Sequence, residues 1–236
     1  MHRLRVATLR GEIVFMAALA LGLAAPASAT FVMTEYQPLG VGFRWTYDDG
    51  SVSTVTGQAF VGTQLTFVLR ESTGDSVNLT NDAAGFRLHA LFTPAGLGLP
   101  ASFTTFTPPF VLANAVVDAG QTINSSGSIA LAIEGFGTFP LSYTGSAHVV
   151  GLEPVSVPYG DFDALRIDSS FRIFGDILGT PFDDTALGFD WYARGVGPVF
   201  QGERGLVSFV PEPGSALLLG GGLAALAIAR RRPHPP

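Results

Sequence analysis

Apolar and polar side chains alternate in Leu165-Arg166-Ile167-Asp168-Ser169-Ser170-Phe171-Arg172-Ile173. The odd positions of this stretch are mostly apolar, and its even positions are polar. A period of two places one set of side chains against a core and the other toward water, which is typical of a half-buried β-strand. The stretch therefore predicts an antiparallel sheet with one buried face.

The same alternation recurs along much of the chain between residues 30 and 209. It is found in Val61 to Arg70, Phe86 to Phe92, Ser128 to Ile133 and Leu187 to Tyr192. In the last of these, we expect the apolar set Leu187, Phe189 and Trp191 to face the core, and Asp190 and Tyr192 to face water. No window between residues 30 and 209 sustains a helical period over several turns.

Turn-forming residues separate the predicted strands. They are Asp49-Gly50, Asn81-Asp82, Asn124 to Gly127 and Pro158 to Asp161. The segment Thr93 to Pro109 is rich in Pro, Gly and Thr, which predicts a long irregular connection. We therefore predict a mainly β chain of about eight to ten strands, arranged as an antiparallel curved sheet, a half-barrel or a sandwich.

Three blocks of the chain carry a shared pattern. They are Tyr36 to Tyr47, with Tyr-x-Pro-Leu before Trp-x-Tyr, then Val157 to Ile167 and Asp190 to Val199. Their order resembles that of a broad, mostly uncharacterised group of exported bacterial β-proteins. The resemblance implies a strongly curved antiparallel sheet, related to periplasmic lipoprotein-carrier half-barrels. The chain departs from the pattern at Tyr159, where a small residue is usual, and at Pro198.

The N-terminus has the features of a secretory signal peptide. Arg3, Arg5 and Arg10 precede an apolar run from Ile13 to Ala25, and small residues stand at Ala27 and Ala29. This order of a basic region, an apolar region and a small-x-small site predicts cleavage after Ala29. We expect residues 1–29 to be removed and the exported chain to begin at Thr30.

The C-terminus has a different three-part pattern. Val210, Pro211, Glu212 and Pro213 are followed by an apolar run from Ala216 to Ala229 and by Arg230, Arg231 and Arg232. The arginines favour the cytoplasmic side of a membrane. The apolar run would span about 21 Å as a helix, less than the roughly 30 Å of a bilayer core. A short segment of this kind suits temporary retention in the inner membrane better than permanent anchoring.

This tail resembles the PEP-CTERM sorting signal of exported bacterial proteins. The resemblance covers only Val210 to Arg232 and implies processing near Pro211-Glu212-Pro213 by exosortase, an integral-membrane enzyme. An ordinary uncleaved anchor is the alternative. The chain thus divides into a signal peptide (1–29), an exported β domain (30–209) and a sorting or anchor segment (210–236).

The exported domain is acidic and contains no cysteine. Residues 30–209 hold 7 Arg against 17 acidic residues, a formal net charge of −10. Such a charge excludes nucleic acid as a partner, because phosphate binding needs basic patches. The absence of cysteine excludes thiol nucleophiles, cysteine-type zinc sites and iron–sulfur clusters. We predict no cofactor and no metal.

Each candidate functional residue of the domain also has a purely structural interpretation. Two groups of acids could supply oxygen ligands for Ca²⁺, although neither has an EF-hand or RTX spacing. The first group is Asp161, Asp163 and Asp168, and the second is Asp183, Asp184 and Asp190. We interpret them as solvated acids. His89 or His148 could complete a hydrolase triad, but the chain has no Gly-x-Ser-x-Gly motif. Trp45 and Trp191 either fill the core or grip a ligand.

We therefore expect a non-catalytic protein of the cell envelope or extracellular matrix. It would be exported, held briefly in the inner membrane by its tail, and then released to the surface or the exopolysaccharide. The alternative is an extracytoplasmic binding module that holds an apolar ligand or a glycan in a curved sheet. A secreted hydrolase is the third possibility.

Overall fold

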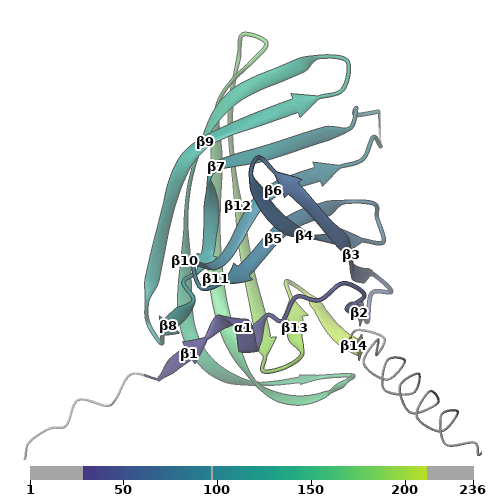
Figure 1. Cartoon of the computed structure of the whole chain (residues 1–236), viewed down its shortest axis with the longest axis vertical. Helices are drawn as coiled ribbons and strands as arrows, with labels where there is room; N and C mark the ends of the chain where they lie inside the picture. Colours follow the sequence, from purple (N-terminus) through teal and green to yellow (C-terminus); the bar gives the residue numbers. More distant parts are fainter. Residues whose placement is uncertain (1–28, 97, 212–236) are drawn as a thin grey trace, which may run out of the picture.

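The structure is a computed structural model that describes residues 29–96 and 98–211 (Figure 1). The described chain is almost entirely β. Its elements are β1 (Thr30–Val32), α1 (Met33–Tyr36), β2 (Arg44–Tyr47), β3 (Val52–Val61), β4 (Gln64–Glu71), β5 (Ser76–Asp82), β6 (Gly85–Thr93), β7 (Ser102–Ala113), β8 (Val116–Asp118), β9 (Thr122–Ile133), β10 (Gly137–Val157), β11 (Gly160–Ile177), β12 (Thr180–Ala193), β13 (Gly197–Gln201) and β14 (Arg204–Val210).

Twelve strands of the described chain form one antiparallel sheet that closes into a barrel. The order around the barrel is β10-β11-β12-β13-β14-β2-β3-β4-β5-β6-β7-β9, and β9 pairs again with β10. The prediction of a mainly β, antiparallel, curved sheet is confirmed. Its finer form differs, because the sheet closes rather than ending as a half-barrel or pairing as a sandwich.

Closure is confined to one end of the barrel, which we call the closed end. Strand β12 pairs with β13 only over Asp190 to Ala193, so its stretch Thr180 to Gly188 is paired only with β11. On the other side, β2 reaches β3 only as far as Thr54. The short strands β13, β14 and β2 therefore join β12 to β3 at this end only. Away from this end, one edge of β12 and one edge of β3 pair with no strand of the described chain. Strands β1 and β14, at the two ends of the described chain, both lie at the closed end (Figure 1).

The N-terminal segment packs into the closed end. β1 pairs with β8 outside the barrel sheet, and α1 follows it directly. Phe31, Met33 and Tyr36 are buried in one cluster with barrel residues such as Phe86 and Tyr192. Burial of these large apolar side chains is the main favourable contribution to this packing.

Trp45 lies at the centre of a second buried cluster, beside the strands that close the barrel. Its side chain is fully buried, and its indole nitrogen donates a hydrogen bond to the Val196 carbonyl at 2.7 Å. The indole stacks on Phe209 with a centroid distance of 5.6 Å. Gly197 adopts φ +97°, and a Cβ there would lie 3.1 Å from the indole nitrogen. The glycine permits both the turn and the close approach of the tryptophan.

Several predicted turns are confirmed. Asp49-Gly50 joins the paired strands β2 and β3, and Gly50 has a positive φ of 82°. Pro158 and Tyr159 lie between β10 and β11, at the turn expected from the second sequence block. These turns can be predicted from the sequence because turn geometry depends on the local residue types.

Two other local predictions are wrong. Asn124 to Gly127 is not a turn but part of β9. The segment Thr93 to Pro109 is not an irregular connection throughout, because β7 begins at Ser102. Pro108 and Pro109 fit within β7 because the ladder to β6 is interrupted there: Leu88 pairs with Phe110, and Ala90 pairs with Thr105. Proline is tolerated in a strand at such an irregularity.

The predicted orientation of β12 is also wrong. Leu187 and Phe189 are exposed, at 79% and 39%, whereas Tyr192 is buried and faces the interior with Asp190. The alternation is present, but its apolar residues Leu187 and Phe189 face outward, and Trp191 is only partly buried. The barrel interior is wide enough to take the polar set instead.

Ala27, the apolar tail, and the sorting residues Glu212, Pro213 and Arg230 to Arg232 lie outside the described residues. Ala29 lies just before β1, and Val210 is the last residue of β14, followed by Pro211. No helix within residues 29–96 and 98–211 is long and apolar enough to cross a membrane.

Candidate functional site

A cavity of about 210 Å³ lies in the barrel interior near the closed end. Its lining divides into two chemical parts. One part is apolar and consists of Leu69, Val77, Leu79, Phe86, Leu88 and Leu112. The other part is polar apart from a proline and consists of Gln37, Glu71, Asp190, Tyr192, Pro198 and Gln201. A concave apolar surface with a few converging polar groups is the usual form of a small-molecule site.

Gln37 reaches this cavity because α1 ends there. The backbone N–H of Gln37 donates to the Met33 carbonyl at 2.9 Å. Pro38 follows and disfavours continuation of the helix. The Asn81 side-chain amide donates to the carbonyls of Met33 and Gln37, at 2.9 and 2.7 Å, and fixes the segment. The Gln37 side chain is only 2% exposed, and its Oε1 has no hydrogen-bond partner. An unpartnered buried acceptor of this kind is costly, by about 1–3 kcal/mol.

Asp190 lines the same cavity as Gln37 and is the first residue of β12 that pairs with β13. Its Oδ2 accepts a long hydrogen bond, 3.4 Å, from the hydroxyl of Tyr192. None of the ion pairs in the described chain includes Asp190. The carboxylate is therefore held inside the barrel without a directly contacting cation.

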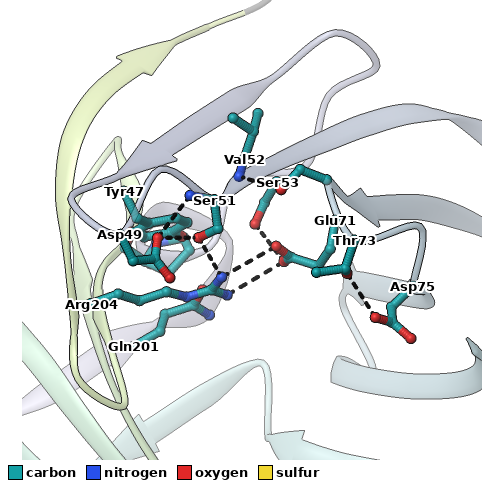
Figure 2. Close-up of polar contacts among 12 residues, drawn as sticks. Tyr47, Asp49, Ser51, Val52, Ser53, Glu71, Thr73, Asp75, Gln201 and Arg204 are labelled. Atoms are coloured by element: carbon teal, nitrogen blue, oxygen red, sulfur yellow. Dashed lines mark hydrogen bonds and ion pairs between the residues drawn. The ribbon is translucent and has the colours of Figure 1, made fainter. Parts of the chain in front are cut away.

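Arg204 neutralises the second acid of the cavity. Figure 2 shows its guanidinium between Glu71 and Ser51, with Gln201 alongside. The nearest Arg204 to Glu71 distance is 3.3 Å, and the guanidinium lies 4.5 Å from the centroid of the Tyr47 ring. Ser53 donates a further hydrogen bond to Glu71 Oε1 at 2.5 Å. Glu71 is thus engaged on both oxygens, whereas Asp190 is not.

Burial dominates the electrostatics of the unpaired groups. Desolvation raises the pKa of Asp190 to about 6, against a partial lowering by the Tyr192 hydrogen bond and by Arg204. Desolvation also raises the pKa of Tyr192 well above its ordinary value, and the neighbouring Asp190 adds to this effect. Asp190 is therefore mostly ionised at pH 7 and costs the folded state free energy there.

The Asp190→Asn variant should therefore be more stable than the wild type at pH 7.5 but not at pH 4. The Asp190 pKa is raised on folding, so the folded state favours the protonated acid. The penalty is absent below about pH 4, grows between pH 4 and 6, and is complete above pH 6. Removing the charge should raise the unfolding free energy at pH 7.5 by up to about 3 kcal/mol. Urea unfolding followed by tryptophan fluorescence measures it.

Asp184→Asn is the matched control, since Asp184 is an exposed acid on the same strand. It should change the unfolding free energy by less than about 0.5 kcal/mol at either pH. An equal gain from Asp190→Asn at pH 4 and pH 7.5 would contradict the assignment of a buried charge.

The other candidate acids do not gather at one place. Asp183 on β12 pairs with Arg172 on β11 at 2.6 Å, and Asp168 pairs with Arg166 of the same strand at 2.7 Å. The Arg172 guanidinium lowers the pKa of Asp183. Within residues 29–96 and 98–211, no group of three or more His, Asp or Glu side chains is placed to hold a metal ion.

The two histidines of the domain lie away from the cavity lining. His89 Nε2 and the Thr80 hydroxyl form a buried hydrogen bond of 3.0 Å, and burial lowers the pKa of His89. His148 is exposed, and its Nδ1 lies 3.1 Å from the Thr122 hydroxyl. Neither histidine is hydrogen-bonded to a carboxylate, as a triad base would be.

The tryptophans have separate roles. Trp45 is a core residue, as the core interpretation expected. Trp191 is partly buried, donates to Glu153 at 3.0 Å, and has the Arg166 guanidinium 5.0 Å from its ring centroid. The two indoles do not stack on one another as a gripping pair, because Trp45 stacks on Phe209 and Trp191 contacts Phe189 and Phe200 edge-on.

Sequence reasoning missed most of the cavity residues. The pattern predicted that Asp190 and Tyr192 face water, with Asp190 a solvated acid or a calcium ligand, and it gave no role in a site to Gln37, Glu71 or Arg204. One signal was available: Asp190 and Tyr192 share a face by the period of two. The remaining residues come from distant strands, and local patterns do not report their meeting.

Comparison with known proteins identifies the tail. Residues 209–232 match the PEP-CTERM protein-sorting motif, so the chain carries this motif at its C-terminus. No curated protein matches the chain.

Two solved structures are similar at low identity. One is a provisionally assigned lipoprotein from Parabacteroides distasonis, with 12% identity, a TM-score of 0.37, and coverage of 74% of this chain and 98% of that one. The other is a provisionally assigned exported protein with a YmcC-like fold from Bacteroides fragilis, with 14% identity, a TM-score of 0.33, and coverage of 75% and 99%.

Proposed function

We propose that the PEP-CTERM motif directs this chain to the exosortase pathway and that its barrel serves outside the cytoplasm as a non-catalytic binding module. The observation that carries the second part is the interior cavity, whose lining combines six apolar side chains with Gln37 and Asp190. A purely structural role at the surface or in an exopolysaccharide matrix rests on the sorting motif alone. The unsatisfied Gln37 Oε1 gives a reason to prefer ligand binding, because a bound donor would remove its cost.

The size of the cavity sets the size of the ligand. A cavity of about 150 Å³ in another protein holds benzene, so about 210 Å³ suits a molecule of roughly seven to ten non-hydrogen atoms. The lining favours an amphipathic molecule, with its apolar part against Leu79 and Leu88 and its polar end toward Gln37.

Hexanol is a suitable neutral probe of this proposal. Isothermal titration of the exported protein, purified from an expressing host, should detect saturable binding. Leu88→Phe, which fills the apolar side of the cavity, should weaken binding at least about tenfold, because steric exclusion removes the site. Leu187→Phe, at an exposed position, is the matched control and should bind as the wild type does. Absence of binding, or equal binding by both variants, would refute an interior ligand site.

A further inference from the structure

The polar part of the cavity lining offers hydrogen-bond acceptors and little positive charge. Gln37 Oε1 is buried and unpartnered, and the Asp190 carboxylate has only the 3.4 Å contact with the Tyr192 hydroxyl. The nearby guanidinium of Arg204 is already engaged with Glu71, Ser51 and Gln201. Gln37 Oε1 and the Asp190 carboxylate are therefore acceptors that a donor on a ligand would satisfy.

Aromatic faces border the same end. Phe86 and Tyr192 line the cavity and contact each other edge to face, with ring centroids 6.1 Å apart. Aromatic rings attract cations through their π-faces, and the attraction increases when water is excluded. Phe86 belongs to the apolar part of the lining, together with the leucines.

Resting on the proposed function, we propose that the cavity recognises a primary ammonium carried on a short apolar group, such as an alkylamine or arylalkylamine. The ammonium donates to Gln37 Oε1 and the Asp190 carboxylate, and the apolar group lies against Leu79 and Leu88. An ammonium has three donors and no acceptor, which matches the set of unpaired oxygens. A carboxylate ligand of the same size is repelled by Asp190.

Three probes of equal chain length test the assignment: hexylamine, hexanol and hexanoate. Titration of the exported protein at pH 7.5 should give hexylamine the tightest binding, at least about tenfold tighter than hexanol, because a charge-assisted hydrogen bond is stronger than a neutral one. Hexanoate should bind more weakly than hexanol. Phenethylamine against 2-phenylethanol repeats the comparison with an aromatic body.

Single substitutions test which side chains recognise the ammonium. Asp190→Asn should remove the preference for hexylamine over hexanol, with a loss of about tenfold in amine affinity and little change for hexanol. Gln37→Met keeps the length of the side chain but removes its acceptor, and it should weaken amine binding about threefold to tenfold. Asp184→Asn should leave both affinities unchanged. Circular dichroism of each variant confirms that the barrel is folded.

The outcomes separate this inference from the proposed function. One outcome is that hexanol binds the wild type, Leu88→Phe weakens this binding, and hexylamine binds no tighter than hexanol. The cavity is then a binding site, and the ammonium assignment is wrong. The assignment is also wrong if the amine preference survives Asp190→Asn. If none of the probes binds, both proposals are wrong.

Discussion

Changing Pro211, Glu212 and Pro213 to alanine should leave the full-length chain in the inner membrane. Residues 209–232 match the PEP-CTERM motif. In the proposed function, a processing enzyme reads this motif, and the apolar run from Ala216 to Ala229 retains the chain until it is cut. The substitution removes the recognised residues and leaves retention intact. Membrane fractionation and mass determination of the product in a host with exosortase should show wild type shortened and released, and the variant intact and retained.

The arginine cluster provides the complementary variant. Moving each arginine to the bilayer centre costs about 2.5 kcal/mol or more, so Arg230, Arg231 and Arg232 should hold the tail at the cytoplasmic face. Changing all three to glutamine should let the tail slip through the membrane. A host without exosortase is the control, and there the wild type should remain membrane-associated at full length. An intact wild-type tail in both hosts would show that the segment is an ordinary anchor.

Trp45→Ala should lower the unfolding free energy by about 3–5 kcal/mol, the usual loss for truncating a buried aromatic residue. Trp45 is fully buried, stacks on Phe209, and bonds to the Val196 carbonyl across the strands that close the barrel. Because domains of this size are stable by only about 5–15 kcal/mol, such a loss leaves the variant close to unfolding. Urea denaturation at pH 5.5 measures the change.

Two further variants define the cause of that loss. Trp45→Phe keeps most of the apolar contact but removes the indole donor, so it should cost less than Trp45→Ala. Phe60→Ala removes an aromatic side chain that is 71% exposed and should change the unfolding free energy by less than about 0.5 kcal/mol. A loss below about 1 kcal/mol for Trp45→Ala would contradict a central packing role for this residue.

The sequence predicted the class of the fold but not its closure. Alternation in Leu165 to Ile173 and the turn at Asp49-Gly50 are local features, and both are confirmed by the pairing of the strands. Closure depends on the pairing of Val210 with Arg44, which are far apart along the chain. Short strands such as β2 and β13 carry too few residues to show a periodic pattern, so nothing local predicts which strands they join.

The errors have a common physical origin in the two-sided environment of a barrel. In β12 the polar residues Asp190 and Tyr192 face the interior because a cavity is present there. In β9 the polar run from Asn124 to Gly127 remains a strand, and Gly127 is required because a Cβ would lie 2.5 Å from the Thr107 carbonyl oxygen. Residue type alone does not distinguish such a close approach from a turn.

Thr30 and Val210 leave the barrel at the same end, where β1 and β14 lie (Figure 1). The tips of the β9–β10 and β11–β12 hairpins, at Phe136 and Leu178, lie at the opposite end of the barrel (Figure 1). If the tail retains the chain as proposed, these tips would face away from the bilayer. Both tips carry exposed apolar side chains, at 59% and 67%. In that orientation, the two exposed apolar tips would be available to partners on the periplasmic side, whereas β1 would lie beside the membrane.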